Sequence, residues 1–132
     1  MRHVKTPRAP VSAAPLSQAV RSRGLVFTAG IVGIDPELGT MAEGPEGQMR
    51  QAIVNLGAVL AEAGSALDRV IKVTLFIQDI RDYGTINRVY EQLFAPPYPA
   101  RSAVQVVPPN PNILVEIEAV AEADGDGDGA LI

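Results

Sequence analysis

The chain has 132 residues, of which 47% are hydrophobic and 20% charged, a balance typical of one globular domain. It has no cysteine, which excludes disulfides and thiolate metal sites, and its single histidine, His3, lies in the N-terminal segment, which argues against histidine-based catalysis. The formal net charge is −4 and no apolar run reaches the ~20 residues of a bilayer span, so we expect neither nucleic acid nor a membrane as a partner, and a cytoplasmic location.

The N-terminal third predicts short strands and turns. Residues 1–14 are rich in Pro and Ala and indicate an extended lead-in, with a short strand near residues 1–6. Residues 24–34 are β-branched and apolar but interrupted by glycines, which predicts two short strands joined at a bend. Residues 35–39 then predict a turn, and a loop follows as far as Gly47.

The rest of the chain alternates helices and strands. Apolar residues recur at spacings of three and four from Gln48, which predicts a helix that ends at Gly64. A strand is predicted over 70–78, and a second helix, capped by Asp79 or Asp82, ends at Pro96–Pro97. Residues 100–107 and 113–122 predict two further strands. The inward-facing positions are expected to be Met49, Ala52, Ile53, Leu56, Val59, Leu60 and Ala63 in the first helix, Ile71, Val73, Leu75 and Ile77 in the strand that follows, Tyr83, Ile86, Tyr90, Leu93 and Phe94 in the second helix, and Ile113, Val115, Ile117, Ala119 and Ala121 in the last strand.

This order of elements is an α+β layout, in which two helices pack on one face of a mixed or mostly antiparallel β-sheet. Most of the strands carry apolar residues on both faces, and two helices cover only one face. A sheet of this kind usually buries its second face against another copy of the chain. We therefore expect an oligomer; the alternative is a monomer that exposes mainly Ala and Val.

The domain is expected to span residues 1–122, followed by an acidic Gly/Asp tail over 123–132. The run Asp124-Gly-Asp-Gly-Asp-Gly129 matches the first half of a calcium-binding loop. The sequence ends before the glutamate that such a loop needs at its twelfth position, and no helix flanks it. We therefore expect a flexible tail rather than a metal site.

Three polar residues are candidates for function. Arg101 stands at the start of a predicted strand just after Pro99, where its planar guanidinium can form paired hydrogen bonds with a carboxylate. Glu116 and Glu118 lie about 7 Å apart on one face of the last strand and can serve as acid–base groups. The alternatives are a surface arginine and a solvated carboxylate pair that guards a sheet edge.

Several segments together resemble the Rid family of reactive-intermediate deaminases, also called the YjgF family. The Pro-Ala-Arg-Ser and Val-Glu-Ile-Glu-Ala motifs near the C-terminus are the most specific of them. The matching segments are Pro15–Val20, Leu25–Pro36, Asn55–Leu60, Val70–Ile77, Ile86–Glu91, Pro99–Val104 and Val115–Ala121.

The resemblance implies a chorismate-mutase-like fold assembled as a homotrimer, with three clefts between neighbouring subunits. It implies an enzyme similar to 2-iminobutanoate/2-iminopropanoate deaminase. Such a hydrolase converts enamines and imines, such as 2-aminoacrylate and 2-imino acids, to 2-oxo acids and ammonia. The resemblance implies no cofactor and no metal, and a small carboxylate as the substrate.

The resemblance also assigns site residues. Arg101 matches the arginine that holds the substrate carboxylate, and Glu116 matches the glutamate that positions or activates water. Gly30 and Ala103 match positions whose backbone groups contact the substrate. Asn87 matches the helix asparagine near the pocket; the alternative for it is a surface amide.

Three of the expected substrate-binding positions depart from the family pattern. Leu16 replaces a frequent tyrosine, Ala29 a frequent serine, and Ala103 a common cysteine. Backbone contacts survive these changes but side-chain hydroxyl contacts do not, so we expect a pocket that is more apolar, slower, or built for another substrate. The alternatives are a non-catalytic or regulatory trimer that binds small carboxylates such as 2-oxo acids, and a different deaminase on the same scaffold. An RNA-directed activity is disfavoured by the acidic balance of the chain.

Overall fold

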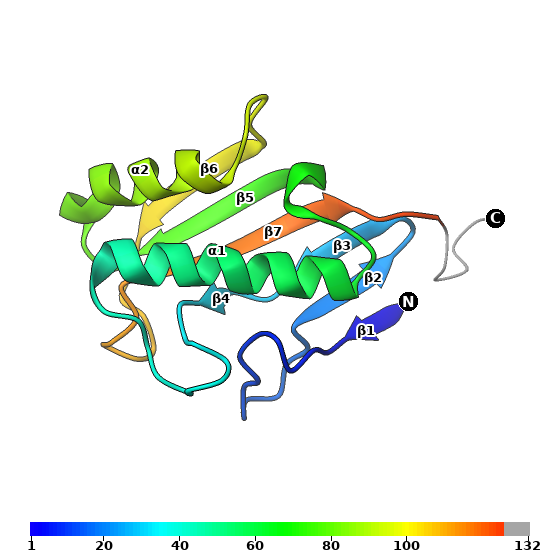
Figure 1. Ribbon diagram of the computed structural model, residues 1–132, viewed down its shortest axis with the longest axis horizontal. Coiled ribbons are helices and arrows are strands. Elements are labelled where there is room, and N and C mark those ends of the chain that lie inside the picture. The colour runs from blue at the N-terminus through cyan, green and yellow to red at the C-terminus, as the bar shows by residue number, and fades with distance from the viewer. Residues whose placement is uncertain (126–132) are drawn as a thin grey trace.

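The structure is a computed structural model that describes residues 1–125. In this range a seven-stranded mixed sheet carries two α-helices on one of its faces (Figure 1), which confirms the predicted α+β layout. The strands are β1 (Arg2–Val4), β2 (Ala19–Ser22), β3 (Leu25–Thr28), β4 (Ile31–Val32), β5 (Val70–Ile77), β6 (Ala100–Gln105) and β7 (Val115–Glu122). The helices are α1 (Gly44–Glu62) and α2 (Tyr83–Leu93), with short 3₁₀ turns at Leu67–Arg69 and Ile80–Asp82.

The strand order places the last strand in the middle of the sheet. It runs β1-β2-β3-β7-β5-β6, and β4 also pairs with β7. Strands β5 and β6 are parallel, because α2 carries the chain back across the sheet between them, and the other pairs are antiparallel. β6 therefore lies at an edge, next to α2.

Helix α1 packs on the sheet through the predicted apolar stripe. Every residue predicted for that stripe, from Met49 to Ala63, is buried. The helix begins at Gly44 and not at the predicted Gln48. Pro45 suits the first turn of a helix, because the backbone N–H that proline lacks would have no hydrogen-bond partner there. The prediction began later because the apolar period starts only at Met49.

Contacts from α1 also fix the β4 region. The buried side chain of Asn55 donates hydrogen bonds to the carbonyls of Val32 (2.9 Å) and Ile34 (2.8 Å). A Cβ at Gly33 would lie 2.4 Å from the carbonyl oxygen of Gln48, so α1 approaches the chain here as closely as glycine allows. The segment that leads into β4 is thereby held in a fixed place.

Three predicted core positions were wrong: Ile71, Tyr83 and Ile113, the last of which precedes the start of β7 at Val115 and is only partly buried. Ile71 is exposed because β5 has an irregularity between Val70 and Lys72, which turns Val70 inward instead. Tyr83 is exposed at the start of α2, and Val89 is buried in that helix in addition to the predicted residues.

The N-terminal segment is more ordered than an extended lead-in. It contains β1, as predicted, and β1 pairs with β2, a strand that the sequence pattern does not predict. Thr6 and Ala9 are buried, and the Gln18 side chain accepts a hydrogen bond from the Thr6 N–H (2.6 Å) and donates to the Pro10 carbonyl (2.8 Å). The segment therefore forms part of the domain.

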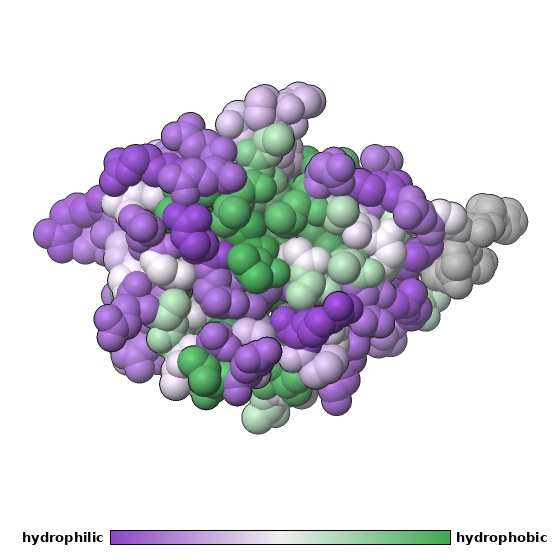
Figure 2. All heavy atoms as spheres, viewed as in Figure 1, coloured by the Kyte–Doolittle hydropathy of each residue, from purple (hydrophilic) through white to green (hydrophobic). Residues whose placement is uncertain are grey.

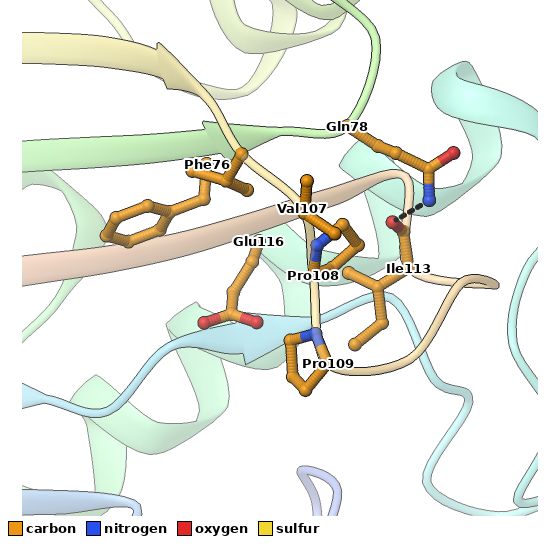
Figure 3. A pocket seen from close by; sticks show the side chains of 8 residues that line it. Phe76, Gln78, Val107, Pro108, Pro109, Ile113 and Glu116 are labelled. Carbon is orange, nitrogen blue, oxygen red and sulfur yellow. Dashed lines mark hydrogen bonds between the residues drawn. The ribbon is translucent and has the colours of Figure 1, made fainter.

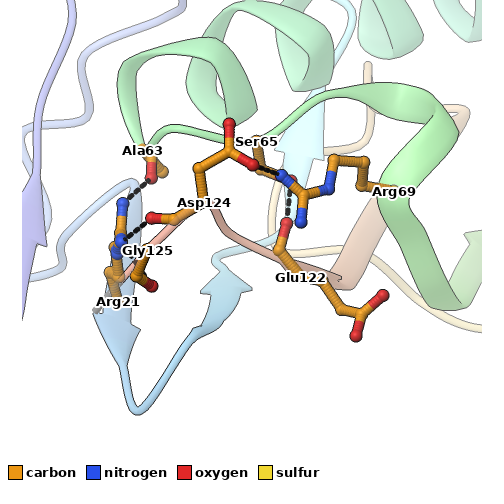
Figure 4. Close-up of polar contacts among 7 residues, drawn as sticks. All are labelled: Arg21, Ala63, Ser65, Arg69, Glu122, Asp124 and Gly125. Atoms are coloured by element: carbon orange, nitrogen blue, oxygen red, sulfur yellow. Dashed lines mark hydrogen bonds and ion pairs between the residues drawn. The ribbon is translucent and has the colours of Figure 1, made fainter. Parts of the chain in front are cut away.

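The chain after β7 is held against the end of α1 (Figure 4). The buried guanidinium of Arg21 donates to the Ala63 carbonyl at 2.9 Å and to the carbonyls of Asp124 and Gly125. Arg69 pairs with the Asp124 carboxylate. The first residues of the segment expected to be a tail thus contact the domain, and the expectation for residues 126–132 lies outside the described residues.

The two faces of the sheet differ. Figure 2 shows the helix-covered face, where apolar atoms gather near the centre between α1 and α2 and polar atoms surround them. On the opposite face the described strands leave apolar side chains uncovered, with Phe27 47% and Val104 44% exposed. Neither helix is long and apolar enough to cross a membrane in the part of the chain that the structure describes.

Candidate active site on two faces of the sheet

Arg101 leaves the sheet on the helix-covered face. It is the second residue of β6, and its partner across the parallel ladder is Val73 of β5, which is fully buried beneath the helices. Paired residues of neighbouring strands project to the same face. The guanidinium of Arg101 therefore points toward α2 at the sheet edge.

Helix α2 fixes this guanidinium with three side chains. Arg101 Nη2 donates hydrogen bonds to Asn87 Oδ1 at 2.7 Å and to the Tyr83 hydroxyl at 2.9 Å. Its Cζ lies 4.7 Å from the centroid of the Tyr90 ring, a cation–π distance, and that ring stacks on Phe94 at 4.4 Å. Among residues 1–125, no partner occupies the other guanidinium N–H groups, which leaves them available for an anion.

A hollow of about 370 Å³ adjoins Arg101, which we call the Arg101 pocket; it is lined by Asn87, Tyr90, Glu91, Tyr98, Pro99 and Arg101. Burial raises the pKa of Tyr90, and the positive charge of Arg101 opposes that rise. The Tyr90 hydroxyl is buried and has no hydrogen-bond partner in the described chain. The phenol is therefore neutral near pH 7.

Glu116 lies on the opposite face of the sheet. Its neighbours in β7, Val115 and Ile117, are buried under the helices, and its own ladder partner in β5 is Phe76. Burial, and secondarily the negative charge of Glu118, raise the pKa of Glu116 above its ordinary value of 4.5. The carboxyl group is thus closer to the range in which it can exchange protons near neutral pH.

The Glu116 carboxylate lies directly over Gly30. A Cβ built on Gly30 would be 1.8 Å from Glu116 Oε2, which no real side chain tolerates. The missing side chain at this position is what lets the carboxylate rest against the backbone before β4.

Hollows lie on two sides of this carboxylate. The larger, which we call the Glu116 pocket, has a volume of about 390 Å³ and is lined by Pro10, Val11, Ser12, Ala14, Leu16, Gln18, Ala29, Gly30, Ile31, Val32, Ile34, Pro109, Ile113 and Glu116. The smaller is about 200 Å³, and Figure 3 shows Glu116 there between the ring of Phe76 and Pro109. Both hollows share Pro109, Ile113 and Glu116.

The predicted site residues fall into two groups. Leu16, Ala29 and Gly30 line the Glu116 pocket together with Glu116. Asn87 contacts Arg101, and Ala103 pairs with the buried Leu75 and so faces the helix side. The β-sheet separates the two groups, and one chain does not bring Arg101 to Glu116.

Sequence reasoning missed the role of two tyrosines. Both were predicted as core residues only. Tyr90 is buried as predicted and Tyr83 is not, and both aromatic rings lie against Arg101. A signal was present, because Tyr83, Asn87 and Tyr90 recur at spacings of four and three and so share one face of α2. Within residues 1–125, no cluster of three or more His, Cys, Asp or Glu side chains is placed to hold a metal.

Comparison with known proteins points to a single family. A family model described as endoribonuclease L-PSP matches residues 6–123. A RutC family protein of Aquifex aeolicus is 44% identical over 94 residues, which cover 71% of this chain and 75% of that protein. Human 2-iminobutanoate/2-iminopropanoate deaminase is 37% identical over 106 residues, which cover 80% of this chain and 77% of the enzyme. The crystal structure of Escherichia coli TdcF with bound serine superposes with a TM-score of 0.87 at 34% identity, covering 94% of this chain and 100% of that one.

Proposed function

The chain belongs to the endoribonuclease L-PSP family, also called the Rid or YjgF family, and on this premise we propose that it hydrolyses 2-imino and enamino acids to 2-oxo acids and ammonia. The relatives named as 2-iminobutanoate/2-iminopropanoate deaminases support this assignment. The observation that carries it is a pair of groups suited to the reaction: an arginine with free N–H groups and a partly buried carboxyl with a raised pKa. The location that we propose is the cytoplasm, in keeping with a chain that has no cysteine.

We propose further that the active unit is a homotrimer of the chorismate-mutase-like type. Arg101 and Glu116 project from opposite faces of one sheet, so a site that uses both needs a second copy of the chain. The face that bears Glu116 also exposes apolar side chains such as Phe27 and Val104, which a neighbouring subunit can cover. In this arrangement the Arg101 of one subunit faces the Glu116 pocket of the next.

The chemistry needs only binding and one placed water molecule. The free N–H groups of Arg101 bind the substrate carboxylate, and Glu116 holds a water molecule against the imine carbon. As the water oxygen bonds to that carbon, Glu116 takes its proton and returns a proton to the nitrogen. The resulting carbinolamine then loses ammonia and leaves the carbonyl of the 2-oxo acid. An enamine first gains a proton at its terminal carbon and loses one from its nitrogen to become the imine, and no cofactor takes part.

The test is imine hydrolysis coupled to an amino-acid oxidase that generates the imine. Arg101→Ala is expected to lower the acceleration by on the order of 10²-fold, because it removes paired charge-assisted hydrogen bonds. Arg88→Ala is the matched control, since Arg88 is an exposed arginine of α2, the helix that contacts Arg101, and its side chain bonds only to Thr85 among the described residues. Rates unchanged by Arg101→Ala in a folded protein refute the assignment.

Glu116→Gln separates the role of the glutamate from that of the arginine. It is expected to reduce turnover more than it weakens binding of 2-oxobutyrate, because the amide keeps the size of the side chain but takes no proton. An equal loss of turnover and binding contradicts the role of Glu116 as the water-activating group.

A second candidate is a trimer that binds small carboxylates without catalysis. The absence of a hydroxyl or thiol side chain at Leu16, Ala29 and Ala103 favours it, since none of these residues can orient water or the substrate nitrogen. Titration with 2-oxobutyrate beside the imine assay distinguishes the two. Binding without any acceleration of imine hydrolysis supports the second candidate.

A further inference from the structure

We propose that the Glu116 pocket selects 2-imino acids with bulky apolar side chains, branched or aromatic, over those derived from alanine. This inference rests on the proposed function and names its substrate class. Three observations support it: the residues that line the pocket, its size, and the residues at its rim.

The walls of the Glu116 pocket offer a side chain little besides apolar contact. Of the described residues that line it, Glu116 alone carries a charge. The two polar side chains are used within the protein: Gln18 bonds to Thr6 and Pro10, and the Ser12 hydroxyl accepts from the Ala14 N–H at 3.0 Å. An anionic substrate side chain would meet the Glu116 carboxylate, and a polar one would find few groups to replace the water that it loses.

The size of the pocket exceeds what a short side chain can fill. In a single chain, where the proposed neighbouring subunit does not yet cover it, its volume is about 390 Å³, and an apolar cavity of about 150 Å³ already accepts a benzene ring. A methyl group would leave most of the walls in contact with water. Each further methylene that is buried against them favours binding by about fourfold.

Leu16 and Ala29 form the part of the pocket that sets this preference. Leu16 is 53% exposed at the rim, where an apolar substrate group can cover it. Ala29 precedes Gly30, over which the reactive carboxylate lies, and its N–H donates to the Gln18 carbonyl at 2.8 Å. This backbone bond ties Ala29 to Gln18, two residues after Leu16, so the segments that carry Leu16 and Ala29 run side by side.

The experiment compares kcat/KM for the imines of L-alanine, L-leucine and L-phenylalanine, each generated by an amino-acid oxidase. Wild-type protein is expected to prefer the leucine-derived and phenylalanine-derived imines by about tenfold or more. Leu16→Ser is expected to reduce the leucine-to-alanine ratio several-fold by removing the apolar rim, and Ala29→Leu to reduce it by filling the pocket. Val54→Ser is the matched control, because Val54 is 54% exposed on α1 outside the pocket, and it should leave the ratio unchanged.

A second measurement keeps this inference separate from the proposed function. Binding of 4-methyl-2-oxopentanoate and of pyruvate is titrated for the same variants, which requires no catalysis. Tighter binding of the larger acid without imine hydrolysis supports the proposed selectivity of the pocket and refutes the proposed deaminase activity. A wild-type preference for the alanine-derived imine, or equal binding of both acids, overturns the pocket assignment, as does a ratio that Leu16→Ser and Ala29→Leu leave unchanged.

Discussion

Alanine at Gly30 is expected to disable the site while the fold survives. The new Cβ would lie 1.8 Å from Glu116 Oε2, so the carboxylate must retreat by about 1.6 Å to reach the 3.4 Å at which ordinary contact begins. The side chain can swing away, because its far end is flexible. A misplacement of about 1 Å at a reacting group can cost on the order of 10²-fold in rate, and we expect a loss of that size in kcat/KM for Gly30→Ala.

The free energy of unfolding of Gly30→Ala should change much less than its rate. Gly30 has no positive φ, so alanine adopts its backbone conformation without strain and restricts the unfolded chain by about 0.4–1 kcal/mol. The free energy of unfolding should therefore stay within about 1 kcal/mol of wild type.

Gly33→Ala is the matched control. Its Cβ would meet backbone atoms of Gln48 in α1, at 2.4 Å and 2.7 Å, and these cannot swing aside. The expected result is destabilisation of about 1–3 kcal/mol or more from overpacking. The two glycines thus separate an effect on the site from an effect on the fold.

The assay pairs imine hydrolysis with urea unfolding on both variants. If Gly30→Ala retains a rate within about threefold of wild type, the position of the Glu116 carboxylate does not control the reaction, and the reasoning fails. If both variants lose the same stability, the distinction between a side-chain and a backbone contact is wrong.

Three further predictions follow from single contacts. Tyr83→Phe removes one hydrogen bond to Arg101 and should lower kcat/KM by about fivefold, corresponding to ~1 kcal/mol, with unfolding unchanged; a rate equal to wild type would remove Tyr83 from the site. Because Glu116 acts as a base, activity should fall as the pH drops through its raised pKa. Glu118→Gln removes a neighbouring negative charge, so it should lower the pKa of Glu116 and move this fall in the pH–rate profile to lower pH. A move to higher pH would contradict Glu118 as a cause of the raised pKa. Arg21→Ala should lower the free energy of unfolding by about 2 kcal/mol, because the buried carbonyl of Ala63 loses a charged donor. An unchanged midpoint in a denaturant titration would show that the contact contributes nothing.

The sequence predicted the helices and the central strands because their apolar periods are regular. All the predicted inward positions of α1 are buried. The errors have local causes that a period cannot show: the irregularity in β5 that turns Ile71 outward, and the four-residue strand β2, where Arg21 breaks the apolar pattern although it is buried. Arg21 is buried because backbone carbonyls from distant segments surround it, and no local pattern predicts such partners.

The sequence predicted which residues form the candidate site, but not how they are arranged in space. Arg101 and Glu116 were selected from their motifs; in the structure Arg101 bonds to Asn87, and the Glu116 carboxylate lies beside Gly30. The tyrosines at Arg101 were missed because an aromatic residue on the inner face of a helix is usually part of a core. That Gly30 lies under the Glu116 carboxylate could not be seen either, since the two residues meet only through the pairing of β4 with β7.

Placing Arg101 and Glu116 on opposite faces of the sheet has a consequence for mixed populations of subunits. If each cleft combines one residue from each of two chains, a chain that lacks the arginine and a chain that lacks the glutamate are both inert alone, yet co-assembly regenerates intact clefts. Random mixing in equal amounts restores about a quarter of them. Two defective alleles of such a protein would then complement each other in one cell.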